Sequence, residues 1–102
     1  MKTLAYDLHL HSCLSPCGDN DMTPANIAGM AKIIGLDLIA LTDHNSCKNC
    51  PAVAIAAREY GLLFLPGMEL TTAEEVHVLC YFASLDAAMD FDRYVSDRKS
   101  VV

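Results

Sequence analysis

No apolar run in this 102-residue sequence approaches the roughly 18 residues that a membrane-spanning helix needs. The longest apolar stretches, residues 33–41 and 62–70, are interrupted by glycine, aspartate or proline. Asp7 and His9 follow the first residues too soon for the apolar core of a signal peptide to form. We therefore expect a cytoplasmic protein that makes no membrane contact.

Basic residues are also scarce, with 7 lysines and arginines against 13 acids and a net charge of -6. A module that binds nucleic-acid backbones directly needs a basic surface, so we expect no direct binding of nucleic acid by this chain. Bound divalent cations would offset part of this acidity. The 5 cysteines are odd in number and lie in a chain without an export signal, which predicts free thiols and no disulfides.

The motifs of two common hydrolase classes are missing as well. We find neither a P-loop nor a GxSxG elbow, which argues against a Walker-type nucleotidase and a serine esterase. No linker or low-complexity segment divides the chain. With 53% hydrophobic residues and a mean hydropathy of +0.27, the sequence predicts one small globular domain.

Hydrophobic periodicity predicts alternating strands and helices. Residues 3–11 alternate between apolar and polar side chains, as in a half-buried strand, whereas residues 36–41 are nearly all apolar, as in a strand buried on both faces. Further strands are expected at residues 62–65 and 76–82, and helices at 24–34, at 52–60 and after a cap at Asp86. This order predicts an α/β fold with a mainly parallel sheet.

His9 and His11 form the first group of candidate metal ligands. Two residues apart on a strand, their imidazoles project from the same face, about 6 to 7 Å apart. The alternative interpretation is that they are ordinary polar residues at the end of a strand, and an HxH pair alone does not decide between the two.

A second group, Asp43-His44-Asn45, follows the second strand directly. The carboxyl ends of the strands are where α/β folds build their sites. Aspartate and asparagine are also favoured in turns, which is a sufficient alternative explanation for Asn45. A turn has no particular need for an imidazole, so His44 favours a functional role.

Glu69 lies just past the third predicted strand in an otherwise apolar stretch, and His77 begins the fourth. A carboxylate in such a place is unfavourable unless it is paired or binds a metal. A salt bridge is the alternative, but Lys48 is the only basic residue expected near this end of the sheet. All 4 histidines and Glu69 are thus expected at one edge of the sheet, which together predicts a metal site.

The segments that carry these residues, 7–12, 41–45 and 67–69, resemble the first three motifs of the PHP (polymerase and histidinol phosphatase) family. The resemblance implies a distorted (β/α)7 TIM-like barrel, of which this chain would supply the first four strands and remain incomplete. It further implies two or three divalent transition metals, zinc, manganese or iron, and hydrolysis of phosphoesters.

Residue roles follow from the same resemblance. It implies that His9 and His11 bind one metal, that Glu69 bridges to a second metal bound by His77, and that His44 serves a third. Asp43 is similar to an acid that assists catalysis by orienting His44 or a metal-bound water. A further ligand is expected about five or six residues after the HxH motif, and Cys17 and Asp19 are the candidates.

The cysteines allow a different zinc site. Cys13 and Cys17, together with Cys47 and Cys50, have spacings that suit a structural zinc module. That hypothesis leaves the histidines and Glu69 unexplained. The simplest alternative is that Cys13, Cys47 and Cys80 are small buried hydrophobic residues.

The predicted reaction is hydrolysis of a small phosphorylated metabolite or nucleotide by a metal-bound hydroxide. A metal-binding PHP-like module without turnover is the alternative function. Sequence alone does not separate the two, because loops and further strands select the substrate.

Chain length bears on both functions. We expect residues 1–96 to be the N-terminal part of a PHP domain, truncated and weakly active or inactive as it stands. Residues 97–102 break the helical pattern and match one reading frame of a common sequencing adapter, which predicts a non-native tail. An open barrel edge also predicts self-association.

Overall fold

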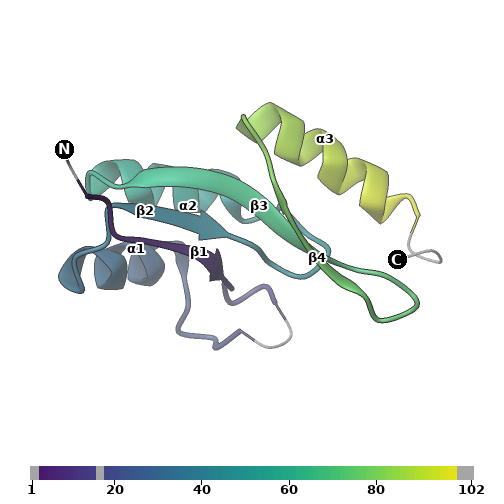
Figure 1. Cartoon of the computed structure of the whole chain (residues 1–102), viewed down its shortest axis with the longest axis horizontal. Coiled ribbons are helices and arrows are strands. Elements are labelled where there is room, and N and C mark those ends of the chain that lie inside the picture. The colour runs from purple at the N-terminus through teal and green to yellow at the C-terminus, as the bar shows by residue number, and fades with distance from the viewer. Residues whose placement is uncertain (1–2, 16–17, 99–102) are drawn as a thin grey trace.

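The computed structural model describes residues 3–15 and 18–98 (Figure 1). Strands and helices alternate in the first part of the chain, and a hairpin and a last helix complete it. The elements in order are β1 (Tyr6–Leu10), α1 (Pro24–Ile33), β2 (Leu38–Leu41), α2 (Cys50–Glu59), β3 (Leu63–Thr71), β4 (His77–Tyr81) and α3 (Leu85–Ser96).

The four strands form one sheet in the order β1-β2-β3-β4. β1, β2 and β3 are parallel and are connected through α1 and α2, whereas β4 returns antiparallel to β3. The predicted α/β fold with a mainly parallel sheet is therefore confirmed. Because β4 runs backwards, its first residue lies at the same edge of the sheet as the last residues of β3.

Local sequence signals explain where α1 begins and ends. Thr23 caps the helix by accepting a hydrogen bond from the Asn26 backbone N–H, and Pro24 occupies the first helical position. Gly35 follows the helix with a φ of 87°, a left-handed conformation that glycine adopts without steric penalty. The chain can then turn sharply into β2.

The core lies between the sheet and the helices. α1 and α2 contact each other on one face of the sheet, and α3 packs against β3 (Figure 1). Ile39 and Leu41 of β2, Val53 of α2 and Met68 of β3 are all at most 1% exposed. The near-continuous apolar run of β2 is thus explained by burial on both of its faces.

The sheet is curled, as the side-chain contacts of β4 show. Tyr81 of β4 donates a hydrogen bond of 2.6 Å from its hydroxyl to the Leu8 carbonyl of β1, although two strands lie between them in the sheet. The β1–β2 register breaks between Asp7 and Leu10, on either side of the residue whose carbonyl accepts this bond. Such irregularities increase local twist and redirect side chains.

Two local predictions were wrong. Ser84, rather than Asp86, caps α3, since its side chain accepts a hydrogen bond from Ala87 N–H while Asp86 lies within the first turn. β3 runs on to Thr71, so Glu69 lies inside this strand and not beyond it. The extension was missed because its partner is β4, a long-range pairing that the local pattern does not contain.

Within residues 3–15 and 18–98, no helix has the length and apolar character needed to cross a membrane. Of the predicted tail, Asp97 and Arg98 follow α3 as a turn, and residues 99–102 lie outside the described residues. The prediction that residues 97–102 are non-native stays a prediction.

Candidate metal centre

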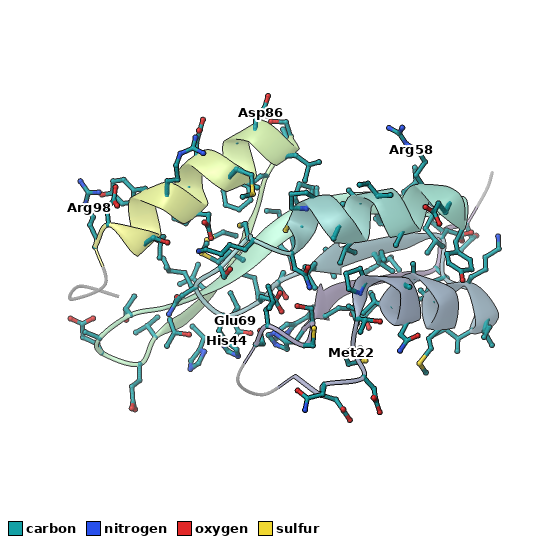
Figure 2. All side chains as sticks on the ribbon, turned by 180° about the vertical axis from the view of Figure 1, so that it is seen from behind. Met22, His44, Arg58, Glu69, Asp86 and Arg98 are labelled. Atoms are coloured by element: carbon teal, nitrogen blue, oxygen red, sulfur yellow. The ribbon has the colours of Figure 1, made fainter. Side chains whose placement is uncertain are left out.

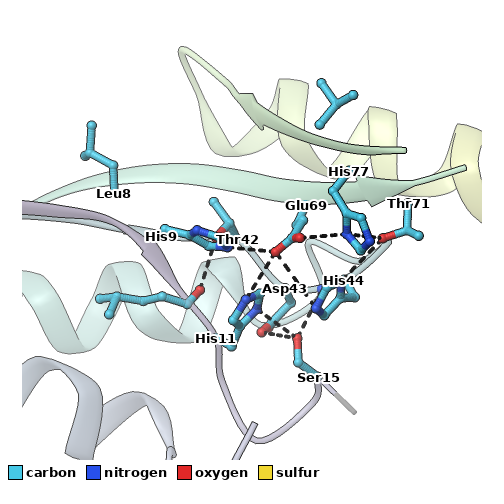
Figure 3. Close-up of polar contacts among 12 residues, drawn as sticks. Leu8, His9, His11, Ser15, Thr42, Asp43, His44, Glu69, Thr71 and His77 are labelled. Atoms are coloured by element: carbon cyan, nitrogen blue, oxygen red, sulfur yellow. Dashed lines mark hydrogen bonds and ion pairs between the residues drawn. The ribbon is translucent and has the colours of Figure 1, made fainter. Parts of the chain in front are cut away.

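Four imidazole rings surround the carboxylate of Glu69 (Figure 3). Oε1 lies 2.7 Å from His9 Nε2, 3.2 Å from His11 Nε2 and 3.8 Å from His44 Nε2. Oε2 lies 2.9 Å from His77 Nδ1. The rings of His11 and His44 stack with their centroids 4.7 Å apart. All histidines of the sequence therefore meet at one acid.

The sheet topology produces this convergence. His9 lies in β1 and His11 just after it, while His44 follows β2 and Glu69 lies near the end of β3. These parallel strands end at the same edge. His77 is the first residue of β4, and the antiparallel pairing of Thr71 with His77 brings it to that edge too. Figure 2 shows His44 and Glu69 side by side at the same end of the sheet.

Backbone hydrogen bonds hold His44 beside Glu69. The Glu69 N–H donates to the Asp43 carbonyl at 2.9 Å, and the Asn45 N–H donates to the Glu69 carbonyl at 3.0 Å. Asn45 adopts the left-handed conformation with a φ of 53°, and its side-chain oxygen accepts a 2.8 Å hydrogen bond from Thr71 N–H. Asn45 is thus a turn residue, as the alternative interpretation proposed, and one that ties the β2 loop to β3.

Close packing of the strands below the cluster requires a glycine at position 67. A Cβ atom there would lie 2.8 Å from the Cys80 carbonyl oxygen and 3.0 Å from the Leu41 carbonyl oxygen. Both neighbours are backbone atoms that cannot turn away. The small residue two positions before Glu69 therefore lets β2, β3 and β4 approach closely at the site.

The cluster lies at the molecular surface around a shielded acid. The side chain of Glu69 is 9% exposed, those of His11 and His44 are 21% and 23% exposed, and those of His9 and His77 are about half exposed at 50% and 53%. Solvent, ions or a ligand can therefore reach the histidines from one side, while the carboxylate remains fixed beneath them.

The surroundings also set the protonation of two groups. Burial acts to raise the pKa of Glu69, but hydrogen bonds with His9 and His77 outweigh it and lower the pKa overall. The pKa of His11 is lowered, mainly by burial and also by the neighbouring His44. An ionised carboxylate and a neutral imidazole are the forms that bind metals.

These donors fit divalent transition metals. Two groups of three donors, His9 with His11 and Glu69, and His44 with Glu69 and His77, have their ligand atoms within 4.8 Å of one another. Glu69 belongs to both groups, which suits a bridging carboxylate. Imidazole and carboxylate together favour zinc, manganese or iron over calcium and magnesium, which prefer oxygen ligands alone.

The grouping of the histidines differs in one respect from what the family resemblance implies. The structure places His44 in one group with His77, whereas the resemblance assigns these residues to different ions. Which residue binds which ion stays a prediction.

Asp43 lies behind the cluster and is 1% exposed. Its carboxylate accepts hydrogen bonds from the Ser12 backbone N–H at 2.6 Å, the Ser12 hydroxyl at 2.5 Å and the Ser15 hydroxyl at 2.8 Å. It is thus engaged by serines instead of by the ring of His44. Its proposed role in catalysis stays a prediction.

Cys17 and Asp19 are the two candidates for the further metal ligand. Cys17 lies outside the described residues, so its predicted role is untested. Asp19 belongs to neither group of metal-binding donors, and its carboxylate accepts a hydrogen bond from the Asp21 N–H at 3.0 Å within its own loop.

The cysteine hypothesis gains no support from the part of the chain that the structure describes. Cys47 and Cys50 are fully buried, and their thiols both donate to the Gly67 carbonyl. The hydrogen bond between the two thiols raises the pKa of Cys47 and lowers that of Cys50, so the pair does not offer the two thiolates that a zinc site of this kind requires. Cys13 and Cys80 are only partly buried, so the small-hydrophobe interpretation suits Cys47 better than these two.

Sequence reasoning missed the hydroxyl groups around the site. Ser12 and Ser15 are buried and contact Asp43, and Thr71 Oγ1 lies 3.4 Å from His44 Nδ1 and 3.3 Å from His77 Nδ1. Ser12 and Thr71 stand within or beside the recognised motifs, so their proximity to candidate ligands was a usable signal. Nothing in the local sequence of Ser15 indicates that it is buried.

Comparisons with known proteins bear on both the fold and the site. The model of the PHP domain matches residues 7–97. A 5'-3' exoribonuclease of Haemophilus influenzae is 32% identical over 80 residues, which cover 76% of this chain and 28% of that protein. A 3',5'-nucleoside bisphosphate phosphatase of Chromobacterium violaceum is 34% identical over 73 residues, which cover 72% of this chain and 25% of that protein. The chain thus spans about a quarter of the length of these relatives.

A crystal structure shows the same fold. The protein, from Bifidobacterium adolescentis and assigned to the metal-dependent phosphoesterases, superposes with a TM-score of 0.69 at 25% identity over 97% of this chain and 36% of its own. The expected fold, the first four strands of an incomplete TIM-like barrel, is confirmed.

Proposed function

Because this chain belongs to the PHP domain family, we propose that it holds the metal centre of a divalent-metal-dependent phosphoesterase. Its relatives include an exoribonuclease and a nucleoside bisphosphate phosphatase, and a structural neighbour is assigned to the metal-dependent phosphoesterases. All three descriptions denote hydrolysis of phosphate esters. They support a small phosphorylated metabolite or nucleotide as the substrate class.

The convergence of four imidazoles on the Glu69 carboxylate is the observation that carries this proposal. His9 and His11 would hold one ion together with Glu69, and His44 and His77 would hold another with the same acid. Such ions, when bound, activate water at neutral pH and neutralise the charge of a phosphoryl group.

The chain's own residues prepare the site for this chemistry. Glu69 is kept ionised by its histidine neighbours, and the shifted pKa of His11 favours its neutral form. His9 and His77 are half exposed on the open side of the cluster. A phosphate ester can therefore approach from solvent, while Asp43 and its serine partners stay shielded behind the ligands.

The test is to measure metal binding and phosphate release on the same protein preparation. Equilibrium dialysis with Zn²⁺ and Mn²⁺ should show binding by the wild-type chain and at least about a 10- to 100-fold loss of affinity in Glu69→Gln. Glu74→Gln is the matched control, because Glu74 is an exposed acid in the loop between β3 and β4. Equal affinity of the two variants would contradict the assigned site.

Phosphate release is then assayed with a nucleoside bisphosphate, a short RNA and a sugar phosphate. We expect slow, metal-dependent release from at least one substrate class, lost in Glu69→Gln and retained in Glu74→Gln. Release that is unaffected by a chelator or by Glu69→Gln would refute the catalytic proposal.

A metal-binding module without turnover is the second candidate function. The observation that favours it is the small share of each related protein that the chain matches: 28% and 25% of the two relatives and 36% of the structural neighbour. Metal binding without phosphate release from any of the three substrate classes would support this second function over the first.

A further inference from the structure

Ser15 joins three parts of the site, although nothing in its local sequence marks it. It lies in the loop after β1 and is 4% exposed. Its hydroxyl oxygen lies 2.8 Å from Asp43 Oδ1, 3.1 Å from the His44 backbone nitrogen and 3.4 Å from His11 Nδ1 (Figure 3). One buried oxygen thus contacts an acid, a backbone N–H and the ring of a candidate metal ligand.

Counting protons fixes the direction of these contacts. A serine hydroxyl carries one hydrogen and two lone pairs, and Ser15 donates its hydrogen to the Asp43 carboxylate. Its oxygen can then only accept from its other two neighbours. The His44 backbone N–H is one donor. His11 Nδ1 can be the other only if that nitrogen carries the ring proton.

This arrangement decides which nitrogen of His11 is free to bind a metal. With the proton on Nδ1, the lone pair is on Nε2, and His11 Nε2 is the atom that faces Glu69 Oε1 at 3.2 Å. Metal-binding histidines generally donate their other N–H to a fixed acceptor, which sets the tautomer and the ring orientation. Ser15 occupies the place of that acceptor.

We propose that Ser15 is a positioning residue that links the buried Asp43 carboxylate to His11 and holds the His11 ring in the Nδ1–H tautomer, with Nε2 presented to the metal. This inference rests on the proposed metal site and deepens it. It also gives Asp43 a different target from the one that the family resemblance implied. Asp43 acts on the ring of His11 through Ser15, which also accepts a hydrogen bond from the His44 backbone N–H.

Ser12 provides the matched control. It is fully buried, and its hydroxyl also donates to Asp43, at 2.5 Å to Oδ2. Its hydroxyl also accepts a 3.2 Å hydrogen bond from the Leu14 N–H and, among the described residues, makes no hydrogen bond with a histidine ring. Ser12→Ala and Ser15→Ala therefore each remove one serine hydroxyl from the same carboxylate, but only Ser15→Ala removes the acceptor for His11 Nδ1.

The test is the tautomer of His11, read from the ring ¹⁵N chemical shifts of the metal-free chain at about pH 8, where histidine is neutral. We expect a larger Nδ1–H fraction in the wild type and in Ser12→Ala than in Ser15→Ala, because without the Ser15 acceptor the ring proton moves to Nε2, which lies 3.2 Å from the ionised Glu69 carboxylate. Ser15→Thr keeps the hydroxyl and should restore the wild-type tautomer. An Nε2–H tautomer in the wild type would overturn the proposal without any variant having to fold.

Zn²⁺ affinity gives a second readout. We expect an affinity loss of about 10- to 100-fold in Ser15→Ala, as for other partners of metal-binding histidines, with a smaller loss in Ser12→Ala and recovery in Ser15→Thr. Equal tautomer and affinity effects in the two alanine variants would show that Ser15 only supports the fold. Because the tautomer is measured without metal or substrate, it can fail or succeed independently of the proposed phosphoesterase activity.

Discussion

At the scale of single residues, Glu69 combines burial with charge. A carboxylate that is 9% exposed would ordinarily be destabilising, but four imidazole nitrogens lie within 3.8 Å of its oxygens. Burial acts to raise its pKa, but contacts with His9, His77 and His44 lower the pKa below the ordinary value of 4.5. The pKa of His11 is lowered as well. Burial brings it below 6.5, so the ring is favoured in its neutral form, whereas Glu69 is favoured in its charged form.

Both shifts predict that the metal-free chain loses stability as the pH falls. The unfolded chain binds a proton at His11 first, so stability begins to decrease as the pH falls through 6.5 towards the folded pKa of His11. The contribution of Glu69 is fully present above 4.5 and is lost as the pH falls through its lower folded pKa. Urea unfolding in a chelator, from about pH 8 to pH 3, measures both effects.

Glu69→Gln separates the two contributions. We expect a smaller stability decrease below pH 4.5 in this variant, because glutamine does not titrate, while the exposed-site control Glu74→Gln keeps the full decrease. The same pH dependence below 4.5 in both variants would show that Glu69 is not the titrating group.

At the scale of secondary-structure elements, α3 illustrates how the start of a helix is selected. Ser84 has an extended backbone and accepts a hydrogen bond from Ala87 N–H, while Asp86 lies in the first turn, where its charge interacts favourably with the helix dipole. The helix then reaches Asp92, which is 4% exposed and accepts a 2.8 Å hydrogen bond from the Cys47 N–H. α3 is thereby attached to the loop that leads into α2.

Substitutions of Ser84 and Asp86 at the start of α3 should decrease the free energy of unfolding by different amounts. Ser84→Ala should decrease the free energy of unfolding by about 1 kcal/mol, because it leaves a helical N–H without its side-chain acceptor. Asp86→Asn should decrease it by only about 0.3 to 1 kcal/mol, an effect that salt screens. Urea unfolding at low and high salt distinguishes them. A larger, salt-insensitive loss in Asp86→Asn would identify Asp86 as the cap after all.

At the scale of the whole molecule, the sheet curls but leaves β1 at one edge. In the part of the chain that the structure describes, β1 pairs with β2 alone. Tyr6 in this strand is 62% exposed and Leu4 just before it is 43% exposed. An apolar strand edge of this kind is a template for pairing with another chain.

We therefore propose that the chain associates with further copies through β1. Sedimentation equilibrium should show a weight-average mass that rises with concentration, and Tyr6→Lys should suppress the rise by placing a charge on the edge strand. Ile55→Lys is the matched control, because Ile55 is similarly exposed, at 63%, but lies on α2. A monomer at every concentration, or equal suppression by both variants, would contradict association through this edge.

The sequence by itself determined the elements and the identity of the candidate ligands. Alternation, a continuous apolar run and the Thr23-Pro24 cap specify strands and a helix through interactions between near neighbours. Histidines in a short chain and an acid in an apolar stretch are chemically unusual enough to indicate a metal site before any coordinates are known.

Only the tertiary structure decided which groups stand around those ligands. The extension of β3 and the antiparallel return of β4 bring His77 to Glu69, and they depend on pairing between segments that carry no local signal for each other. Ser15 is far from Asp43 in sequence, and the cap of α3 differs from the expected one by two positions. Hydrogen-bond partners depend on distances of a few tenths of an ångström, which long-range packing sets and local propensity does not.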